Sequence, residues 1–469
     1  MAGFKIVGPV CLLPEPLIPM QTLQQLRAGE LAGARQLKLQ ENLDEFPAEI
    51  FSLAESLEVL DLSGNQLNHL PQDFARLHKL RVLFCSGNPF RELPAVLGQC
   101  PQLEMIGFKS CQIELVPSPA LPAGLRWLIL TDNRITALPE QIGHCARLQK
   151  LMLAGNRLTG LPDALANCRQ LELLRLSANQ LPGLPRWLFD LPRLAWLALS
   201  GNPMTLRLER RVAARHPLPV IDWSQIKLDQ RLGEGASGVI YRALWHASDQ
   251  NVPVAVKLFK GAVTSDGLPQ SELAACLAAG RHHGLIPLLG EISGHPQQQG
   301  VVMALIDPSF RVLAGPPSLA SCTRDVYPAD TCLDVAQIVR IATDIADATL
   351  HLHQRGMIHG DLYAHNILHH PGEGALLGDF GAASILPQDV PLAAASAIEM
   401  RAFGCLLQEL GQYCDWADEA HQQRWLQLAA LCLAPDPAAR PDFALVLRQL
   451  RGWQAARPIV QHRFSHSRP

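Results

Sequence analysis

The sequence contains no long hydrophobic run, no long run of charges of one sign and no paired cysteine motif. No stretch reaches the roughly 18 consecutive apolar residues that a membrane-spanning helix requires, so we expect no transmembrane segment. The 40 lysines and arginines are nearly balanced by 43 aspartates and glutamates. Proteins that bind nucleic acid or an anionic membrane surface usually carry a basic cluster. We therefore expect neither of these partners.

Motifs for metal binding or disulfide formation by cysteine are also missing. The 12 cysteines include no CxxC pair and no Cys/His cluster at zinc-ligand spacing, so reduced and mostly buried thiols are expected. Residues 1–20 contain four prolines and no basic segment ahead of an uninterrupted apolar stretch, which disfavours a secretory signal. A cytoplasmic location is the expectation that follows.

The chain does have enough apolar material for large cores. Its 469 residues are 48% hydrophobic and 18% charged, a composition typical of folded chains. At roughly 100 to 200 residues per domain, this length predicts two or three folded units. We divide the chain into an N-terminal cap (1–33), a first domain (34–216), a linker (217–225), a second domain (226–452) and a C-terminal tail (453–469).

The first domain repeats itself. Asparagine recurs at positions 42, 65, 88, 133, 156, 179 and 202 with Cys111 in the one missing place, so every step is 23 residues except one of 22. Each position ends a phrase such as LEVLDLSGN, residues 57–65, which resembles the leucine-rich-repeat family. The resemblance covers about residues 34–216 in eight copies and implies an α/β solenoid. Leucines in such a solenoid are buried between repeats, and a buried asparagine column needs backbone partners.

The concave face of this solenoid should carry the residues that lie four and six positions before each asparagine. An apolar, aromatic stripe at these positions is typical of a binding surface. We therefore predict a protein or peptide partner in the region of Phe84, Trp127 and Trp196. Contacts with neighbouring repeats or with the chain's own second domain are the alternative. The stripe comprises Val59, Val82, Phe84, Met105, Trp127, Ile129, Met152, Leu173 and Trp196, beside Lys38, Asp61, Lys150 and Arg175.

The second domain begins with groups suited to binding phosphate. The segment LGEGASGVIYRA, residues 232–243, places three glycines in a turn between two strand-like stretches, where backbone can approach phosphate without an obstructing side chain. The apolar strand VPVAVKL then delivers Lys257, which can hold the α- and β-phosphates. Glu272 follows fifteen residues later on a predicted helix and can pair with that lysine.

Two further motifs follow in order along the chain. The segment MIHGDLYAHNIL, residues 357–368, resembles the catalytic loop of protein kinases, and LLGDFG follows it at residues 376–381. The resemblance continues to DPAARP and covers about residues 226–452. It implies an α+β bilobal protein-kinase-like domain behind the solenoid, with ATP and Mg²⁺ as cofactors. The implied activity is phosphoryl transfer to protein hydroxyls, with serine/threonine as the default acceptor.

The resemblance also assigns individual residues. Asp361 would be the catalytic base, assisted by Lys257, Glu272 and His359, and the metal ligands would be Asn366 and Asp379. The strand VVMALID is expected to lead into the hinge that binds the adenine base. The nucleotide contacts would be Leu232, Gly233, Gly235, Gly238, Val239, Ala255, Lys257, Ala304, Ile306 and Leu368.

The catalytic loop departs from the kinase pattern. Gly360 replaces the arginine that in many kinases meets a phosphorylated activation loop, which leads to the hypothesis that activity does not depend on such phosphorylation. Alanine at Ser384 and Ser396 should then leave activity intact. Tyr363 stands where serine/threonine kinases have lysine, and only His365 represents the arginine of tyrosine kinases, so the loop leaves the acceptor open.

The segment after the DFG motif also departs from the pattern. It is short and contains no APE motif, so Arg440 lacks the glutamate with which it would ordinarily pair. Glu399 takes the place of an aspartate in the helix that follows this segment. The usual platform for docking a peptide is therefore expected to be shortened.

Two alternative functions remain open from the sequence. The combination of HGDL with an asparagine five residues after the aspartate also occurs in aminoglycoside and choline kinases, which phosphorylate small molecules. The GEGASGVIYRA, VAVK, DFG and DPAARP segments favour the protein-kinase branch instead. The other alternative is a pseudokinase scaffold in which the solenoid carries the function, although no core catalytic residue is missing.

Overall fold

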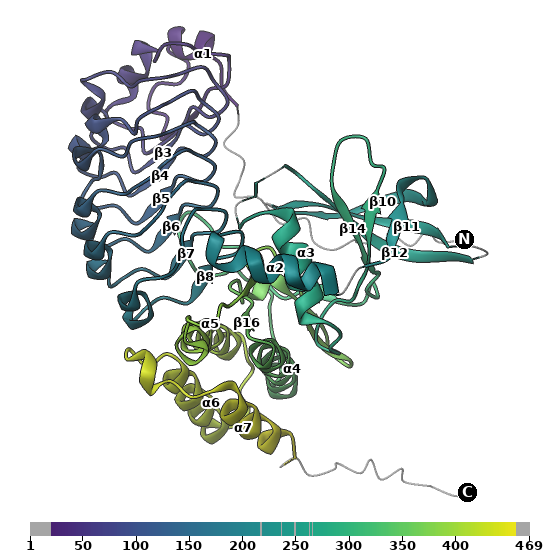
Figure 1. The fold of residues 1–469 in the computed structure, drawn as a ribbon. Helices are drawn as coiled ribbons and strands as arrows, with labels where there is room; N and C mark the ends of the chain where they lie inside the picture. Colours follow the sequence, from purple (N-terminus) through teal and green to yellow (C-terminus); the bar gives the residue numbers. More distant parts are fainter. Residues whose placement is uncertain are drawn as a thin grey trace, which may run out of the picture.

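The computed structural model describes residues 20–215, 218–235, 237–247, 250–261, 263–264 and 266–455. Most of the expected N-terminal cap, residues 1–19, and most of the expected tail, residues 456–469, lie outside the described residues. Across the described ranges, no helix is long and apolar enough to cross a bilayer. The repeats form a curved sheet, and the second domain sits against its inner side (Figure 1).

The repeat domain is one parallel sheet of eight strands in sequence order. The central leucine or isoleucine of each strand is fully buried inside the solenoid, because each repeat covers the apolar residues of the next. A single helical turn, α1 (Leu23–Arg27), precedes the first strand. The strands are β1 (Gln36–Lys38), β2 (Val59–Asp61), β3 (Val82–Phe84), β4 (Met105–Gly107), β5 (Trp127–Ile129), β6 (Lys150–Met152), β7 (Leu173–Arg175) and β8 (Trp196–Ala198).

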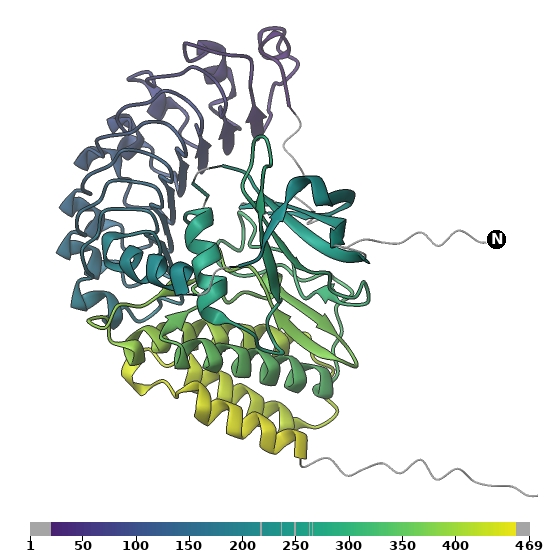
Figure 2. The same ribbon diagram turned by 45° about the vertical axis from the view of Figure 1, so that its right-hand side comes forward.

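Short 3₁₀ helices form the outer side of the solenoid (Figure 2). Most of them begin directly after a proline, whose fixed φ suits the entry into a helical turn. They are η1 (Ala48–Leu53), η2 (Phe74–Arg76), η3 (Ala95–Gln99), η4 (Ser118–Ala120), η5 (Glu140–His144), η6 (Asp163–Asn167) and η7 (Arg186–Asp190).

The recurring asparagines form a hydrogen-bonded ladder. The Asn65 amide donates to the carbonyls of Leu39 at 2.8 Å and Leu62 at 2.9 Å, and equivalent bonds recur along the column. Cys111 replaces one asparagine by donating its thiol to the Cys85 carbonyl at 3.2 Å. Asn42 differs because it belongs to the first repeat, where it is exposed with a φ of 56°.

Two straight rows of side chains line the inner face, because neighbouring strands pair in register. One row runs from Gln36 through Trp127 to Trp196, and the other runs from Lys38 through Ile129 and Arg175 to Ala198. The stripe deduced from the repeat spacing lies along these rows.

Helix α2 (Pro203–Arg215) closes the C-terminal end of the solenoid. The Glu209 carboxylate accepts from the Gly201 backbone N–H at 2.9 Å and so ties the helix to the last repeat. The expected linker then contributes β9 (Val220–Asp222) to the sheet of the second domain, where it pairs in parallel with strand β13 (Leu288–Ser293). The connection is therefore folded into the second domain.

The N-terminal lobe of the second domain is a six-stranded sheet in the order β10-β11-β12-β14-β13-β9. Its long antiparallel hairpins are rich in β-branched residues, which suit a pleated surface. One helix, α3 (Pro269–Ala279), lies beside α2 in both ribbon views (Figures 1 and 2). The other strands are β10 (Ile226–Glu234), β11 (Gly238–Ala247), β12 (Gln250–Phe259), β13 (Leu288–Ser293) and β14 (Gly300–Ala304), and η8 (Trp223–Gln225) precedes them.

The C-terminal lobe is mainly helical. Helix α4 (Val335–Gln354) begins with a capping box between Asp334 and Gln337 and buries an apolar face at helical spacing. The other helices are α5 (Leu392–Gln412), α6 (Glu419–Cys432), α7 (Phe443–Ala455), η9 (Ala364–Asn366) and η10 (Pro437–Ala439). Short strands β15 (Arg311–Val312), β16 (Met357–Ile358), β17 (Ile367–His370), β18 (Gly374–Leu377) and β19 (Ser384–Ile385) form two small sheets, in the orders β15-β17-β18 and β16-β19.

The apolar cores of the two domains interpenetrate. Leu173, Ala195 and Trp196 of the repeats pack within the core of the second domain. In the opposite direction, five residues of the second domain, Ile358, Leu386, Val390, Ala395 and Ile398, belong to the core of the repeats. Shared packing of this kind holds the two domains in one arrangement and brings the last repeats onto the predicted catalytic loop.

Candidate active site

The glycine-rich turn connects β10 to β11 above the predicted phosphate site. A Cβ at Gly233 or Gly235 would meet nothing within 4 Å, so the backbone here borders open space. A Cβ at Gly238 would instead lie 2.6 Å from the Leu258 carbonyl, so this glycine is required by the close pairing of β11 with β12. The turn is tied together by a 2.9 Å bond from the Gly235 N–H to the Gly238 carbonyl.

Lys257, on β12, lies between two carboxylates. Its Nζ is 2.5 Å from Glu272 Oε1 and 3.3 Å from Asp379 Oδ1. The register of the sequence predicted the contact with Glu272, which lies in the first turn of α3. Burial opposes the charge on the lysine, but Asp379 and Glu272 raise the pKa of Lys257 above its ordinary value. Burial likewise opposes the charge on Asp379, whereas Lys257 lowers the pKa of that carboxyl.

The remaining predicted nucleotide contacts lie on the strands around this lysine. Ala255 is buried on β12 and pairs with Met303 on β14, and Ala304 ends that strand. Leu232, Val239, Ala304, Ile306 and Leu368 are half-buried, as expected for side chains that border a cleft. Their roles stay predictions.

The catalytic loop holds Asp361 beside Asn366. The Asn366 amide donates to Asp361 Oδ2 at 2.8 Å and to the Asp361 carbonyl at 3.0 Å. His359 contacts the DFG segment: its Nε2 is 2.9 Å from the Gly378 carbonyl, and its ring lies against Phe380. We therefore describe His359 as a positioning residue for the DFG segment.

Two carboxylates beyond the predicted set hold the catalytic loop. Glu399, on α5, accepts from the Gly360 N–H at 2.8 Å and contacts His353 at 2.7 Å. Asp325 accepts from the His365 N–H at 3.0 Å and contacts its ring Nδ1 at 2.7 Å. Burial opposes the charge on His365, but the adjacent Asp325 raises its pKa. Asp325 stands in an irregular segment without a motif, so the sequence carried no signal for it.

The repeat domain reaches the same loop through Arg175. This side chain is 3% exposed and donates to Asp361 Oδ1 and, at 2.9 Å, to the Gly360 carbonyl. Its Nε lies 2.9 Å from Asp266 Oδ1. Burial opposes the charge, but Asp361 and Asp266 raise the pKa of Arg175, so the guanidinium stays protonated. The sequence placed Arg175 on the concave stripe but gave no indication that it would contact the catalytic loop.

Trp196 packs against the same loop. Its ring stacks on Tyr363 with centroids 4.1 Å apart and planes inclined by 6°, and its Nε1 donates to the Leu362 carbonyl at 3.0 Å. Trp196, which the sequence placed in the expected partner region of the concave face, is therefore covered by the chain's own second domain. Phe84 and Trp127, further along the sheet, are half-buried.

The other departures from the kinase pattern also occur at contacts with the repeats. Arg440 donates to the Pro192 carbonyl of the last repeat at 2.7 Å. The Ser384 hydroxyl accepts from the Leu199 N–H at 3.0 Å and is fully buried. A Cβ at Gly360 would lie 2.5 Å from the Leu197 carbonyl, so a larger residue would clash with β8.

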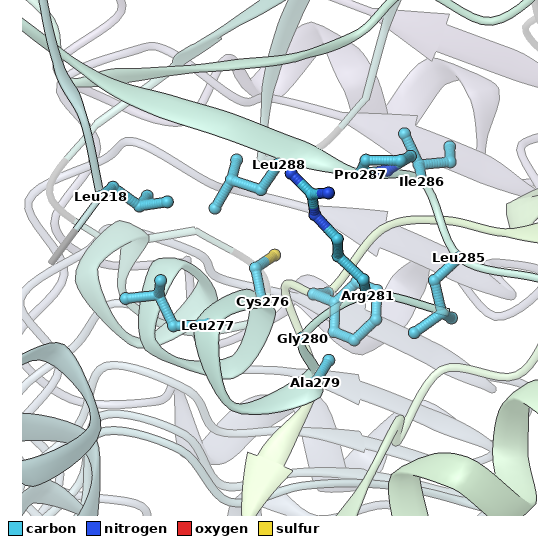
Figure 3. Close-up of a pocket in the computed structure, with 11 residues that line it drawn as sticks. Leu218, Cys276, Leu277, Ala279, Gly280, Arg281, Leu285, Ile286, Pro287 and Leu288 are labelled. Atoms are coloured by element: carbon cyan, nitrogen blue, oxygen red, sulfur yellow. The ribbon is translucent and has the colours of Figure 1, made fainter. Parts of the chain in front are cut away.

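A separate pocket opens behind α3 (Figure 3). Cys276 and Leu277 of the helix face Leu288 and Arg281 across it. Phe380 of the DFG motif is also one of the residues that line it. None of the predicted nucleotide contacts lines this pocket.

Comparison with known families agrees with this geometry. Residues 226–400 match the family described as protein tyrosine and serine/threonine kinase, and residues 33–90, 123–181 and 146–204 match the family described as leucine rich repeat. The chain is a fusion of leucine-rich repeats and a protein kinase domain. The fold class predicted from the sequence, an α/β solenoid followed by an α+β bilobal domain, is confirmed.

Relatives of the kinase domain include both acceptor classes. The chain is 27% identical over 164 residues to serine/threonine-protein kinase A-Raf of Mus musculus, covering 34% of this chain and 24% of that protein. It is 32% identical over 163 residues to a probable serine/threonine-protein kinase of Dictyostelium discoideum, covering 35% of this chain and 9% of that protein. Tyrosine-protein kinase Srms of Homo sapiens is 26% identical over 258 residues, covering 50% of this chain and 49% of that protein.

The chain thus spans about a quarter of the length of the A-Raf relative. Among solved structures, a leucine-rich-repeat protein of Leptospira interrogans is 30% identical, with a TM-score of 0.36 over 41% of this chain and 49% of that one.

Proposed function

We propose that this repeat-kinase fusion transfers the terminal phosphoryl group of ATP to protein hydroxyls, with serine or threonine as the default acceptor. The observation that carries the proposal is the Lys257–Glu272 pair at 2.5 Å, with Asp379 on the same lysine. Asp361 and Asn366 stand together on the catalytic loop. Phosphoryl transfer depends on positioning and charge neutralisation, and these groups are the parts that it requires.

The residues of the site fit a nucleoside triphosphate with magnesium. Carboxylate and amide oxygens are the ligands that Mg²⁺ prefers, and Asp379 and Asn366 supply them. Open space beside Gly233 and Gly235 leaves room for phosphates near the backbone, and Lys257, which Glu272 orients, would bind the phosphates. When bound, magnesium would neutralise charge on the phosphates. Asp361 would accept the proton of the acceptor hydroxyl.

The choice of serine or threonine rests on the relatives rather than on the loop. Two of the three relatives described above are named as serine/threonine kinases and one as a tyrosine kinase. Tyr363 occupies the position that would otherwise separate the two classes, and it is buried under Trp196.

We also propose that the repeats bind a protein partner through the part of their inner face around Phe84 and Trp127. Phe84 and Trp127 support this, because both remain half-buried beside the apolar cluster of Val59, Val82 and Met105, although Leu319 of the second domain also packs against this cluster. Aromatic side chains of this kind are enriched at protein interfaces. Phe84→Glu should abolish binding of a protein partner at this surface without changing nucleotide binding.

The proposed activity is tested with the full chain, Mg²⁺ and labelled ATP, both alone and with a generic protein substrate. Asp361→Asn and Lys257→Met are the inactivating variants, and Arg157→Ala on the exposed surface of the repeats is the control. We expect label on protein that is lost in both inactivating variants and kept in the control. Nucleotide binding without transfer would instead indicate a scaffold. Transfer only to small hydroxyl compounds would indicate the small-molecule kinase alternative.

A further inference from the structure

The last repeats fill the space that the short segment after the DFG motif leaves open. Helix α5 begins at Leu392, only a short way after Gly381, so the kinase domain has little chain of its own to cover the catalytic loop. Strand β8 lies there instead, with the Leu197 carbonyl against Gly360 and the Leu199 N–H bonded to Ser384.

Arg175 brings a charge to an otherwise apolar part of the inner face. At strands β7 and β8 the two inner rows consist of Leu173, Arg175, Trp196 and Ala198. The Arg175 guanidinium engages the Asp361 carboxylate and the adjoining Gly360 carbonyl, while Asn366 holds the other carboxylate oxygen. The carboxylate is therefore fixed at both oxygens, and the peptide before it is fixed as well. One of these fixed points comes from a different domain.

We propose that Arg175 is a positioning residue for phosphoryl transfer, in which the repeat domain supplies the cation that orients Asp361. This inference rests on the proposed function, because it assigns a role within the same site. The catalytic loop thereby has a cation beside Asp361 although position 360 is glycine. The cation comes from β7, and glycine at 360 lets β8 approach.

A removable lid is the competing interpretation, and the packing disfavours it. Lids and moving loops come from regions with few buried apolar contacts. Here Leu173 and Trp196 are buried in the kinase core, at 3% and 1% exposed. Undocking would also expose Ile358 and Ile398, which pack into the core of the repeats.

The kinase lobe is also already assembled while the repeats are docked. The Lys257–Glu272 contact is closed at 2.5 Å in this arrangement. The repeat domain supports it, because Glu209 of α2 accepts from the Ser271 hydroxyl at 2.7 Å, one residue before Glu272 on α3. Docking of the repeats thus accompanies the arrangement that phosphoryl transfer needs.

The test compares Arg175→Met, Arg175→Lys and Arg175→Ala in the full chain. We expect Arg175→Met to lower kcat by about 100-fold, the loss that a small misplacement of a reacting group can cause, while the KM and Kd for ATP change less than about twofold. Arg175→Lys should keep part of the activity. Methylguanidinium at a non-denaturing concentration should restore activity to Arg175→Ala, and ethylammonium should restore less.

Two controls separate positioning from general damage. Glu172→Ala removes the side chain that accepts from the Thr323 hydroxyl across the same interface, outside the catalytic loop, and should lower kcat less than threefold. Hydrogen exchange across residues 359–366 gives a readout without turnover, because Arg175→Met should lose protection in that segment while the repeats keep theirs.

The possible results discriminate between the two ideas. A kcat that is unchanged or raised in Arg175→Met would overturn the inference, and a raised kcat would favour a lid. Failure of guanidinium rescue, with loss of exchange protection across both domains, would reduce Arg175 to a structural role. If the wild-type protein transfers no phosphoryl group, the proposed function is wrong. If hydrogen exchange at residues 359–366 is the same in Arg175→Met as in the wild type, the inference about Arg175 is wrong independently of that result.

Discussion

Trp196→Ala should destabilise both domains together. The side chain is 1% exposed, stacks on Tyr363 and donates to the Leu362 carbonyl, so its removal leaves a cavity at the centre of the interface. A tryptophan buries about 150–250 Å², which at about 25 cal/mol/Å² corresponds to an upper value of about 4–6 kcal/mol. Partial collapse of the cavity reduces this, and we expect a loss of about 3–5 kcal/mol.

The assay is urea unfolding of the full chain, followed by far-ultraviolet circular dichroism. Because the cores interpenetrate, the wild type should unfold in one cooperative transition, and Trp196→Ala should lower its midpoint. Trp187→Ala is the matched control, since that half-buried ring lies on the outer side of the solenoid in η7. A loss no larger than that of the control would refute the reasoning. So would a wild type that unfolds in two steps, only one of which Trp196→Ala shifts.

Three further predictions concern the same interface. Gly360→Ala should lower the free energy of unfolding, measured by chemical denaturation, by about 2 kcal/mol or more beyond the loss in Gly356→Ala. Both glycines have φ near +70°, but only a Cβ at position 360 would clash with backbone atoms. Equal losses in the two variants would contradict this. Burial lowers the pKa of Lys150 to about 8 from 10.5, so the unfolded chain binds the extra proton and the contribution of Lys150 to stability, measured as the difference from Lys150→Met, should rise between about pH 8 and pH 10.5. That rise reaches up to about 3 kcal/mol, and identical pH profiles of the two proteins would count against it. Ser396→Ala should leave phosphoryl transfer intact, and a large loss of activity in this variant would indicate dependence on phosphorylation. Ser384→Ala should instead lower stability by about 1 kcal/mol, because the Ser384 hydroxyl binds the backbone of the repeats.

The last of these refines the hypothesis that activity is independent of loop phosphorylation. Replacing Ser384 and Ser396 together cannot test it cleanly, because Ser384 is fully buried against the repeats and its loss perturbs the interface. Ser396 alone is the cleaner probe.

Local patterns in the sequence were sufficient for the fold of each domain. The 23-residue period of asparagines predicts the solenoid because each position repeats the same backbone bonds, and Asn65 makes the bonds that such a column requires. The kinase pattern likewise implied the pairing of Lys257 with a glutamate on the helix that follows, and the register selected Glu272. The catalytic loop and the DFG segment are contiguous, so their residues are readable as motifs.

Only the tertiary structure showed which residues of the repeats contact the catalytic loop of the kinase domain. Arg175 and Asp361 lie 186 residues apart, and no local periodicity connects them. The absent arginine at position 360 and the missing glutamate partner of Arg440 could be read only as gaps in a motif. In the structure, Arg175 of the repeats contacts the Gly360 carbonyl, and Arg440 donates to the Pro192 carbonyl of the repeats as well as to the Ala397 and Ala434 carbonyls of its own domain. Trp196 is a further example. Its place in an apolar stripe predicted contact with a partner protein, but its ring stacks on Tyr363 of the same chain. Periodicity reports which side of an element is apolar, whereas the identity of the surface that covers it depends on how complete domains fit together.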